Sequence, residues 1–491
     1  MNTRPRRYLW IAIVGLMLSL FGTLAAGLVV IGITPQQLLE QGTMRRPSEL
    51  IRYAKQRLIH HDKLEFVLLP PLHAAQRHYE RPTDELKLPS LGKGQQVHDP
   101  NQFRPAADVL VSSPAELLAA LQRAKPGQII ELAAGTYRFG QKVKIGGASL
   151  ATAPITVRAA KVGAAVIELN TVEGFLINQP YWIFEDLTIR GVCESDYCEH
   201  AFHIVGKAEH TTLRNNYVED FNAHIKVNGY EGDWPDHGVM SHNTLTNTRP
   251  RPTRKPVTPF DLVGANYWKL VDNLVINFVK RDGNQTSVGI FMKGASEGGR
   301  IERNLVICSP NNISQAGARV GISFGGGGTS PTSLCRDGNC ANFEHAGGLA
   351  ANNIVAHCND SGLDINNSIR ITLAHNTLIN TSGIDLRRSP VQARLYGNLY
   401  EGNVRPRDGA VLKQNFDQAM RATDIFQNAD ELDLRWLKAP ENIPSLRGIN
   451  NDFCGAVRAD GTPPGAVSDP ANCKDQWDKL PALLIKKQTD Y

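Results

Sequence analysis

The chain has 491 residues, which is long enough for one elongated domain or for two to three compact ones, so length alone does not decide its organisation. Its 43 glycines and 42% hydrophobic residues indicate many turns between short strands and argue against a bundle of helices. The net charge of +5 is small and is compatible with an acidic polymer as partner; we expect no nucleic-acid partner.

The first element in chain order is an apolar segment at residues 9–33, which holds 25 positions without a charge and follows Arg4, Arg6 and Arg7. A signal peptide has an apolar core of only about 7 to 15 residues, whereas a bilayer needs about 20, so this segment predicts a single retained transmembrane helix. The preceding arginines place residues 1–8 in the cytoplasm and the main domain outside it, in the periplasm or the extracellular space. A cleaved signal ending near residue 27 is the alternative.

Residues 34–107 are expected to form a linker with one short helix, at residues 47–61, followed by extended Pro-rich and charged sequence. A helix is then predicted after Ser113, because Ser113 can cap it, Pro114 suits its first turn, and Glu116 completes a capping box. We expect this helix to cap the N-terminal end of the domain that follows. Residues 128–139 and 153–169 are expected to form its first strands.

A repeat begins after residue 170, in which an asparagine is followed closely by an apolar strand. The separations are 27, 30, 31, 49, 23 and 22 residues, which indicate a basic unit of about 22 residues with insertions. The repeated asparagines are Asn216, Asn243, Asn273, Asn304, Asn353, Asn376 and Asn398. A unit this short buries its apolar edge only by stacking, which predicts an all-β parallel β-helix at residues 108–425 and a C-terminal extension at 426–491. The asparagine amides are expected to bond from coil to coil as a ladder, because asparagine tolerates left-handed backbone.

The eight cysteines are spaced as local pairs, which favours disulfides outside the cytoplasm. The predicted bridges are Cys193 with Cys198, Cys335 with Cys340, and Cys454 with Cys473. Cys308 and Cys358 remain as a possible fourth pair. Zinc is the alternative for the two C-x4-C pairs, but the usual ligand spacing is tighter, so we expect no metal site.

Two motifs carry a resemblance to a known family. KPGQIIELAAGTY at residues 125–137 and APITVRAA at 153–160, together with the coils marked by asparagine, resemble polysaccharide lyases of the chondroitinase B and alginate lyase type. These belong to the wider pectate-lyase-like superfamily, and the resemblance covers roughly residues 108 to 420. It implies a right-handed parallel β-helix that binds an acidic, uronate-containing polysaccharide. It also implies β-elimination, in which a lysine and an arginine of neighbouring coils act on a uronate.

The stretch VGIFMKG at residues 288–294 shows how the strands are expected to face. The two-residue period turns Ile290 and Met292 inward and Phe291 and Lys293 outward. The same alternation predicts an outward polar column with a step of about 4.8 Å per coil. Its other members are Lys226, Asn228, Asp261, Ser323, Asp364, Asn366, Asp385 and Arg387. Such a column suits a groove for a sugar chain, and a plain solvated sheet face is the alternative.

Lys293 matches the lysine of the family best. A lysine acts as a base only when it is neutral, so this role requires a lowered pKa. The alternative is that Lys293 is a surface lysine that only adds solubility. The sequence departs from the family twice. Residues 284–292 lack the acidic residues that hold calcium there, so we expect no cofactor. Residues 321–328 lack the family's arginine, and the positive charge is expected from Arg319 or Arg387 instead.

An inserted loop at residues 329–347 is expected to bring Arg336 or His345 over the groove. His345 would act as a proton donor to the leaving oxygen.

Two other functions stay open. Asp364 and Asp385 resemble the paired carboxylates of a glycoside hydrolase, and a uronate epimerase would use the same groove. A non-catalytic carbohydrate-binding or envelope scaffold protein is also open, because the expected arginine and calcium carboxylates are missing.

Overall fold

The computed structural model describes residues 62–79, 91–98, 103–194, 197–310 and 317–473, with a few single residues before residue 91. The chain forms two units, residues 1–82 and 83–491. The predicted transmembrane segment at 9–33, and most of the predicted short helix at 47–61, lie outside the described residues. Within the described part of the chain, no helix has both the length and the apolar character needed to cross a membrane.

The first unit contains α4 (Asp62–Tyr79), an 18-residue helix where the sequence pattern indicated extended linker. Leucine, alanine and glutamate favour a helix here. Pro70 and Pro71 lie inside it, although an interior proline costs a helix about 3 kcal/mol. The expectation of an extended segment was therefore wrong, because it gave the two prolines more weight than the helix-forming residues around them.

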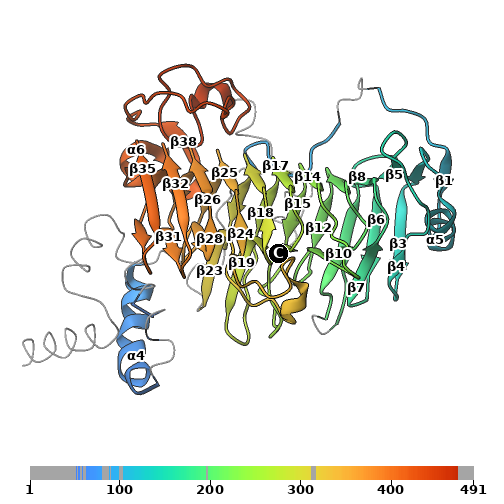
Figure 1. Ribbon diagram of the computed structural model, residues 1–491, viewed down its shortest axis with the longest axis horizontal. Helices are drawn as coiled ribbons and strands as arrows, with labels where there is room; N and C mark the ends of the chain where they lie inside the picture. Colours follow the sequence, from blue (N-terminus) through green and yellow to red (C-terminus); the bar gives the residue numbers. More distant parts are fainter. Residues whose placement is uncertain are drawn as a thin grey trace, which may run out of the picture. The chain divides into compact units, whose positions relative to one another are not determined.

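The second unit is a stack of coils in which each coil adds one strand to each of three long parallel sheets (Figure 1). The strands of the 12-stranded sheet are, in order, β1 (Val109–Val111), β2 (Ile129–Leu132), β5 (Ile155–Ala159), β8 (Trp182–Glu185), β11 (Thr212–Arg214), β14 (Val239–Ser241), β17 (Lys269–Val271), β21 (Arg300–Glu302), β25 (Leu349–Ala351), β29 (Ile371–Ala374), β32 (Gln392–Tyr396) and β35 (Val411–Asn415). Those of the 11-stranded sheet are β3 (Gly135–Phe139), β6 (Ala165–Leu169), β9 (Thr188–Gly191), β12 (Tyr217–Glu219), β15 (Thr244–Thr246), β18 (Leu274–Ile276), β22 (Leu305–Ile307), β26 (Ile354–Ala356), β30 (Thr377–Ile379), β33 (Leu399–Tyr400) and β36 (Gln418–Ala419).

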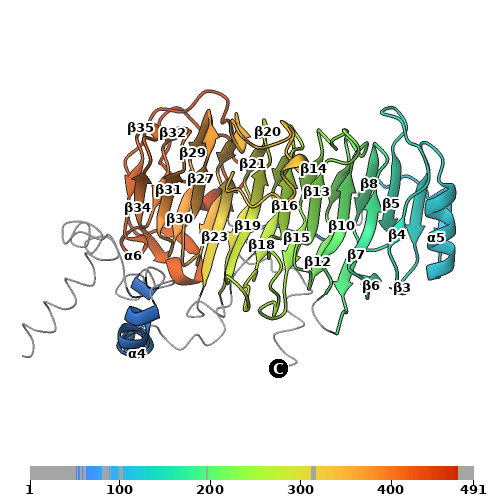
Figure 2. The ribbon, with the colours of Figure 1, turned by 60° about the horizontal axis from the view of Figure 1, so that its bottom comes forward.

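The ten-stranded sheet carries the predicted polar column and is seen in Figure 2. Its strands are β4 (Val143–Lys144), β7 (Glu173–Ile177), β10 (His200–Val205), β13 (Ile225–Asn228), β16 (Phe260–Val263), β19 (Thr286–Lys293), β23 (Ala318–Phe324), β27 (Leu363–Asn366), β31 (Gly383–Arg387) and β34 (Asn403–Pro406). A short parallel sheet of β20 (Ser296–Glu297), β24 (His345–Ala346) and β28 (Ser368–Ile369) lies at the turns that follow it. This stack of parallel strands confirms the predicted all-β parallel β-helix.

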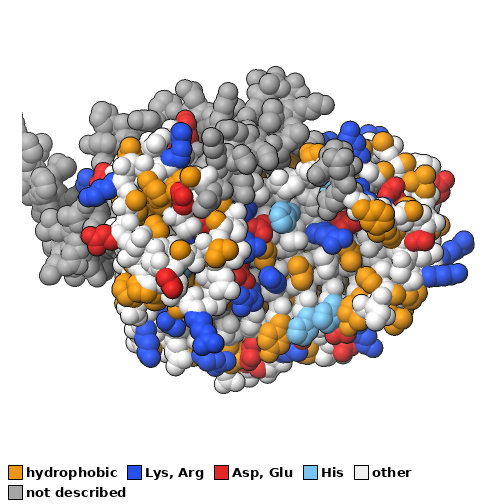
Figure 3. Space-filling view, turned by 90° about the horizontal axis from the view of Figure 1, so that it is seen from above, with side chains coloured by type: hydrophobic (Ala, Val, Ile, Leu, Met, Phe, Trp, Pro, Cys, Tyr) orange, Lys and Arg blue, Asp and Glu red, His pale blue; other side chains and the backbone are white. Residues whose placement is uncertain are grey.

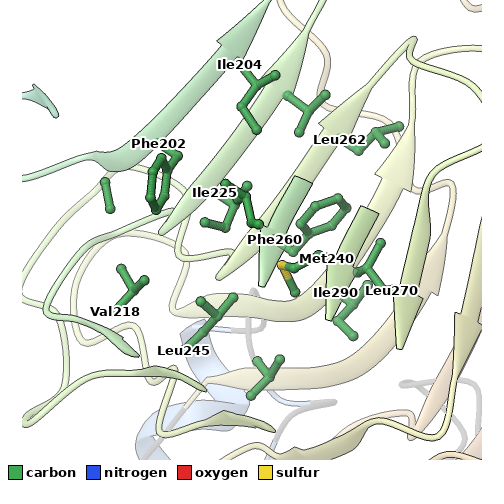
Figure 4. Close-up of a cluster of buried hydrophobic side chains, with 14 of the residues drawn as sticks. Phe202, Ile204, Val218, Ile225, Met240, Leu245, Phe260, Leu262, Leu270 and Ile290 are labelled. Carbon is green, nitrogen blue, oxygen red and sulfur yellow. The ribbon is translucent and has the colours of Figure 1, made fainter. Parts of the chain in front are cut away.

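The core runs through the interior of the coils, where side chains of all three sheets meet. Figure 4 shows Phe260 and Ile290 of the ten-stranded sheet, Leu245 of the 11-stranded sheet and Leu270 of the 12-stranded sheet pointing into the same space. These four side chains are fully buried. Each coil therefore buries its apolar residues against the coils on either side, and this stacking stabilises strands of which most have only three to five residues.

The predicted helix α5 (Pro114–Arg123) closes the N-terminal end of this core. Its first turn is capped reciprocally: the Glu116 amide donates to Ser113 Oγ at 3.3 Å, and the Ser112 amide donates to the Glu116 carboxylate at 2.7 Å. Leu117 and Leu121 are fully buried in the core cluster. The structure therefore confirms the predicted helix and its cap at Ser113.

The seven repeated asparagines form the predicted ladder. Each side-chain amide donates to the side-chain oxygen of the next asparagine at 2.9 to 3.1 Å, from Asn216 through to Asn398. The left-handed backbone belongs to the residue before the ladder asparagine, as at Asp272 and Asn352, and not to the asparagine itself. Asn398 donates to Asp417 at 2.6 Å, and burial raises the pKa of this terminal carboxylate to about 6.

Four disulfides are present, and they account for all eight cysteines. Three are the predicted local bridges, and the fourth joins Cys308 to Cys358 across 50 residues of sequence. Both of these cysteines are fully buried in the core cluster, so this bridge fastens one coil to another inside the β-helix.

Residues 91–98, expected as part of the linker, are packed against the β-helix instead. Lys93 Nζ donates to Asp272 at 2.7 Å and to the carbonyl of Phe453 at 2.6 Å. It therefore joins this segment to a corner of the asparagine ladder and to the C-terminal extension. After the last coil come α6 (Ala422–Ile425) and the extension, which holds the antiparallel pair β37 (Phe426–Asn428) and β38 (Asp433–Trp436) and the short 3-10 helices Ala429–Glu431 and Pro470–Cys473.

Candidate functional site

The candidate site lies on the outer face of the ten-stranded sheet. In β19, Ile290 and Met292 are fully buried in the core, and the alternation of the strand puts Phe291 and Lys293 on the opposite face. Two strands before it, Lys226 of β13 pairs in register with Asp261 of β16. The next pairing aligns Asp261 with Phe291, so the three coils present two lysines around one carboxylate.

Asp261 lies between the two lysines. Lys226 Nζ donates to Asp261 Oδ2 at 2.6 Å, whereas Lys293 Nζ is 3.9 Å from Asp261 Oδ1. Lys293 Nζ also lies 4.3 Å from the centre of the Phe291 ring and donates to the carbonyl of Gly327 at 3.3 Å. Lys293 is only 7% exposed and Asp261 only 5%. Lys293 is therefore an almost buried amine, unlike the solubilising surface lysine that the sequence left open.

Burial and charge shift the pKa values of this cluster. Burial lowers the pKa of Lys293; the charge of Asp261 opposes this, and the nearby charge of Lys226 adds to it. Burial alone would raise the pKa of Asp261, but the two lysines outweigh it and lower that pKa to about 2. Asp261 is therefore a fixed negative charge at neutral pH. The amine of Lys293 loses its proton more easily than a solvated lysine does.

The far end of the predicted column consists of ion pairs. Arg387 donates to both oxygens of Asp364 at 2.9 and 3.0 Å, and Ser323 Oγ donates to the same carboxylate at 3.1 Å. Asp385, the partner of Asp364 in the next coil, accepts from Arg407 at 3.0 Å. Burial raises the pKa of Asp385, against the charges of Arg405 and Arg407. Asp364 and Asp385 are thus adjacent, but arginines engage both.

A residue that the sequence analysis missed, Arg388, lies beside the glycine run at 325–328. Its Nη1 donates to the carbonyl of Gly326 at 3.4 Å, next to the Gly327 carbonyl that Lys293 contacts. A Cβ on Gly327 would lie 3.7 Å from Arg388 Nη1, an ordinary van der Waals distance, so Gly327 lies directly beside this side chain. Arg388 is exposed. The one signal in the sequence was the doublet Arg387-Arg388, and a doublet does not show that the second side chain turns back to a glycine two coils earlier.

Arg319 does not supply charge beside Lys293. It is only 1% exposed and lies five residues before Phe324, the end of β23 that adjoins Met292 and Lys293. That separation is roughly 16 Å along an extended strand. The expectation rested on the shared strand and did not account for the length of that strand.

His345 does not lie in a surface loop over the site. It begins β24, is 1% exposed, pairs with Ser296 Oγ at 2.7 Å and stacks on Phe324 with ring centres 4.8 Å apart. Burial lowers the pKa of His345 to about 3. A buried neutral imidazole with these contacts positions the turn and is not exposed on the outer face, so the expected role as proton donor is corrected.

Other predicted binding residues have partners within the protein. Arg336 forms a bidentate ion pair with Asp236, at 2.8 and 2.9 Å. The Asn228 amide oxygen is 2.8 Å from His203 Nε2, and His203 Nδ1 is 3.2 Å from Glu173. Asn366 is buried, and no described residue donates a hydrogen bond to its Oδ1. His203 and Glu173 were missed because their strands precede the first asparagine of the repeat.

Charged side chains elsewhere on the β-helix are mixed in sign. Figure 3 shows one long face on which acidic and basic side chains are interspersed, with histidines beside hydrophobic residues near one edge. On the 12-stranded sheet, Arg158 pairs with Glu131 at 2.7 Å and Arg214 pairs with Glu185. Arg158 and Glu185 are themselves buried, and the charges of each pair neutralise each other locally.

The fold has counterparts among solved structures. The structure of pectate lyase Pel9A matches with a TM-score of 0.53 at 14% identity, over 74% of this chain and 97% of that one. An alginate lyase from Paenibacillus sp. strain FPU-7 matches at 0.40 and 14% identity, over 63% and 99% of the two chains. A rhamnogalacturonan lyase matches at 0.42 and 12% identity, over 74% and 90%. No protein-family model and no curated protein sequence matches the chain. The chain thus has the parallel β-helix fold of the polysaccharide lyases, as its sequence motifs predicted.

Proposed function

We propose that this β-helix binds an acidic, uronate-containing polysaccharide along the outer face of its ten-stranded sheet and cleaves it by β-elimination, with Lys293 as the base. The observation that carries the proposal is the environment of Lys293, whose amine is almost buried and lies 3.9 Å from Asp261, a carboxylate that Lys226 holds. A lysine whose pKa is lowered in this way is a better general base near neutral pH than a solvated one.

The reaction needs a proton acceptor beside the uronate ring. Lys293 Nζ takes the proton from C5, and the electron pair of that C–H bond forms the double bond between C4 and C5. The C4–O bond breaks, and the leaving oxygen keeps its electron pair and takes up a proton from water, while Lys293 returns its proton to water. The product is one chain with an unsaturated uronate at its new end and one chain with a restored hydroxyl.

Positive charge is needed to neutralise the uronate carboxylate, because this makes the C5 proton more acidic. In the proposal Arg388 supplies it, since Arg388 is exposed and lies against the same glycine run as Lys293. Arg387 is a weaker candidate, because its Nε and Nη2 already donate to Asp364. Lys226 contributes mainly by fixing Asp261, to which it donates at 2.6 Å.

A glycoside hydrolase is the second candidate, and one observation favours it: Asp364 and Asp385 are paired in adjacent coils, and burial raises the pKa of Asp385. The bidentate bond of Arg387 to Asp364 works against it, because a nucleophile or base needs an accessible oxygen. Elimination by Lys293 therefore has the better support.

The proposal also includes the place of the protein in the cell. We place the β-helix outside the cytoplasm, joined to the membrane by residues 9–33. The apolar length of that segment and four disulfides support this, since disulfides persist in oxidising compartments. Resistance of the full-length protein to carbonate extraction would agree with an anchor, whereas a soluble form beginning near residue 27 would contradict it.

The central experiment is a panel of polysaccharides incubated with the protein and followed by near-ultraviolet absorbance. Polyuronates such as pectate, alginate and a uronate-containing glycosaminoglycan are compared with a neutral glucan. Elimination produces absorbance and new reducing ends together, whereas hydrolysis produces reducing ends alone. Lys293→Ala is expected to lower the elimination rate by about 10² to 10⁴ while polymer affinity stays nearly constant. Cleavage by Lys293→Ala at the parent rate, or no cleavage of any polyuronate, would contradict the proposal.

A further inference from the structure

The inserted loop at residues 329–347 is fastened to coils that precede it. Arg336 is its main attachment: the guanidinium donates to both oxygens of Asp236 and to the carbonyl of Gly264 at 3.1 Å. It also lies 5.0 Å from the centre of the Trp234 ring. Asp236 and Trp234 follow β13, and Gly264 follows β16, whereas the loop itself follows β23. The loop therefore runs back along the β-helix past the end of β19, where Lys293 lies.

The same loop binds Gly294, the residue that follows Lys293, at both its amide and its carbonyl. The Gly294 amide donates to Glu344 Oε2 at 2.9 Å, and the Gly294 carbonyl accepts from the Arg336 amide at 2.9 Å. On the neighbouring coil, the Gly264 amide donates to the Lys293 carbonyl at 2.9 Å. Gly294 has φ of +79°, and a Cβ there would lie 2.6 Å from Val263 Cγ1, so only glycine fits this joint.

The structure assigns to this loop the role of a fixed brace that positions the amine of Lys293 and keeps water from it, with Arg336 as its positioning residue. The expectation that Arg336 binds substrate is thereby corrected. Its Nη1 and Nη2 already donate to Asp236, and Nη1 also donates to the carbonyl of Gly264. The brace depends on the proposed function in one respect: a catalytic base is the reason why Lys293 must be held in place. The contacts of the loop do not depend on that function.

The brace has a consequence for the proton affinity of Lys293. The charged groups that face this amine are Asp261 on β16, Lys226 on β13 and Glu344 on the loop, with Arg388 beyond the glycine run. Burial is the largest influence on the pKa of Lys293 and lowers it, while the charge of Glu344 raises it. Releasing the loop should therefore raise the pKa of Lys293. Neutralising Glu344 while keeping its hydrogen bond should lower it.

The experiment measures Lys293 directly and needs no substrate. The purified protein is labelled briefly with acetic anhydride at a series of pH values, and the modified fraction of Lys293 is determined by mass spectrometry of its peptide. We expect Arg336→Ala to move the labelling midpoint up by about one pH unit, because water reaches the amine. Glu344→Gln should move it down. Arg138→Ala, which removes an exposed ion pair with Glu168 in the first coils, is the matched control and should leave it unchanged.

Two further variants keep the test decisive. Arg336→Lys retains the charge but not the planar pair of donor nitrogens. It should therefore give an intermediate shift of the labelling midpoint, and it can be measured even if Arg336→Ala fails to fold. Replacing Cys335 and Cys340 by serine opens the loop and should act in the direction of Arg336→Ala. Labelling midpoints that coincide with the parent in Arg336→Ala and Arg336→Lys, with folding verified by circular dichroism, would overturn the brace.

Kinetics separate the brace from the proposed function. On a polymer that the parent cleaves, Arg336→Ala should lower kcat by about 10- to 100-fold with little change in KM, because a misplaced base affects the chemical step. An increase in KM alone would show that Arg336 binds substrate and would overturn the positioning role. If no polymer is cleaved, the proposed function fails, and the labelling result still decides whether the brace exists.

Discussion

Lys293 Nζ lies 3.9 Å from Oδ1 of Asp261, an oxygen for which no described residue is a hydrogen-bond donor. The other oxygen of the same carboxylate is held by Lys226 at 2.6 Å. Two cations therefore share one buried anion, and the closer cation takes the stronger bond. This unequal sharing leaves Lys293 with a charge partner that is near enough to place its amine and too distant to hold its proton firmly.

Replacing the shared anion should move the pH dependence of elimination. The charge of Asp261 raises the pKa of Lys293, so Asp261→Asn removes that effect and lowers the pKa. A base acts when it has lost its proton, and a lower pKa shifts the rising limb of the rate profile to lower pH. The profile of initial rate against pH measures this. A rising limb that stays in place or moves to higher pH would show that Lys293 is not the titrating base.

Arg388 and Arg387 should differ in what they contribute to elimination. Arg388→Ala is expected to lower kcat/KM by about 10- to 100-fold, since it removes the cation assigned to the uronate carboxylate. Arg387→Ala should mainly destabilise the protein, because it leaves the buried carboxylate of Asp364 without its bidentate partner. Rate assays and urea denaturation of both variants separate the two effects. A large rate loss in Arg387→Ala without loss of stability would reverse the assignment.

Elimination should not depend on calcium. Calcium takes six to eight oxygen ligands, about half of them commonly carboxylates. Around Lys293 the carboxylate of Asp261 is bound by Lys226, and Glu344 accepts the amide of Gly294. Rates measured in EDTA and in added calcium chloride are therefore expected to agree within about twofold. A loss of more than tenfold in EDTA that calcium restores would show a metal site that the sequence did not predict.

The asparagine ladder should contribute strongly to stability. Asn304→Ala removes the donor to Leu270 and to Asn353, and it leaves the Asn273 amide without its acceptor, all in buried positions. Unsatisfied buried groups cost about 1 to 3 kcal/mol each, so we expect the free energy of unfolding to fall by about 2 to 4 kcal/mol. Urea denaturation measures this loss, with the exposed Asn450→Ala as control. Equal stability of the two variants would count against the ladder.

The disulfides should contribute unequally. The Cys308–Cys358 bridge closes 50 residues and the Cys193–Cys198 bridge closes five. On the chain-entropy estimate, the first stabilises the fold by about 4 kcal/mol and the second by about 2 kcal/mol. Denaturation of the two double Cys→Ala variants tests the order. If removal of the short bridge lowers the free energy of unfolding as much as removal of the long one, loop length does not determine how much each bridge stabilises the fold.

Features that depend on local spacing could be predicted from the order of the amino acids. The asparagine period gave the stack of coils and the ladder, and the two-residue period placed Lys293 and Asp261 on the outer face. The capping residues around Ser113 predicted the helix α5. Short spacing predicted three of the disulfides, while Cys308 and Cys358 were paired only as the remainder.

The contacts between outward side chains could be seen only in the folded structure, which shows which of these side chains meet and which are bonded to other parts of the protein. Arg336 pairs with Asp236 across 100 residues of sequence, and Arg388 reaches the carbonyl of Gly326 across 62. His345 lies buried on Phe324, although the sequence around it reads as a surface loop. These contacts depend on the path of an inserted loop and on the direction of long side chains, and neither follows a period. The repeat therefore fixes the scaffold, while the packing of the insertion around Lys293 sets the burial and the charge on which its chemistry depends.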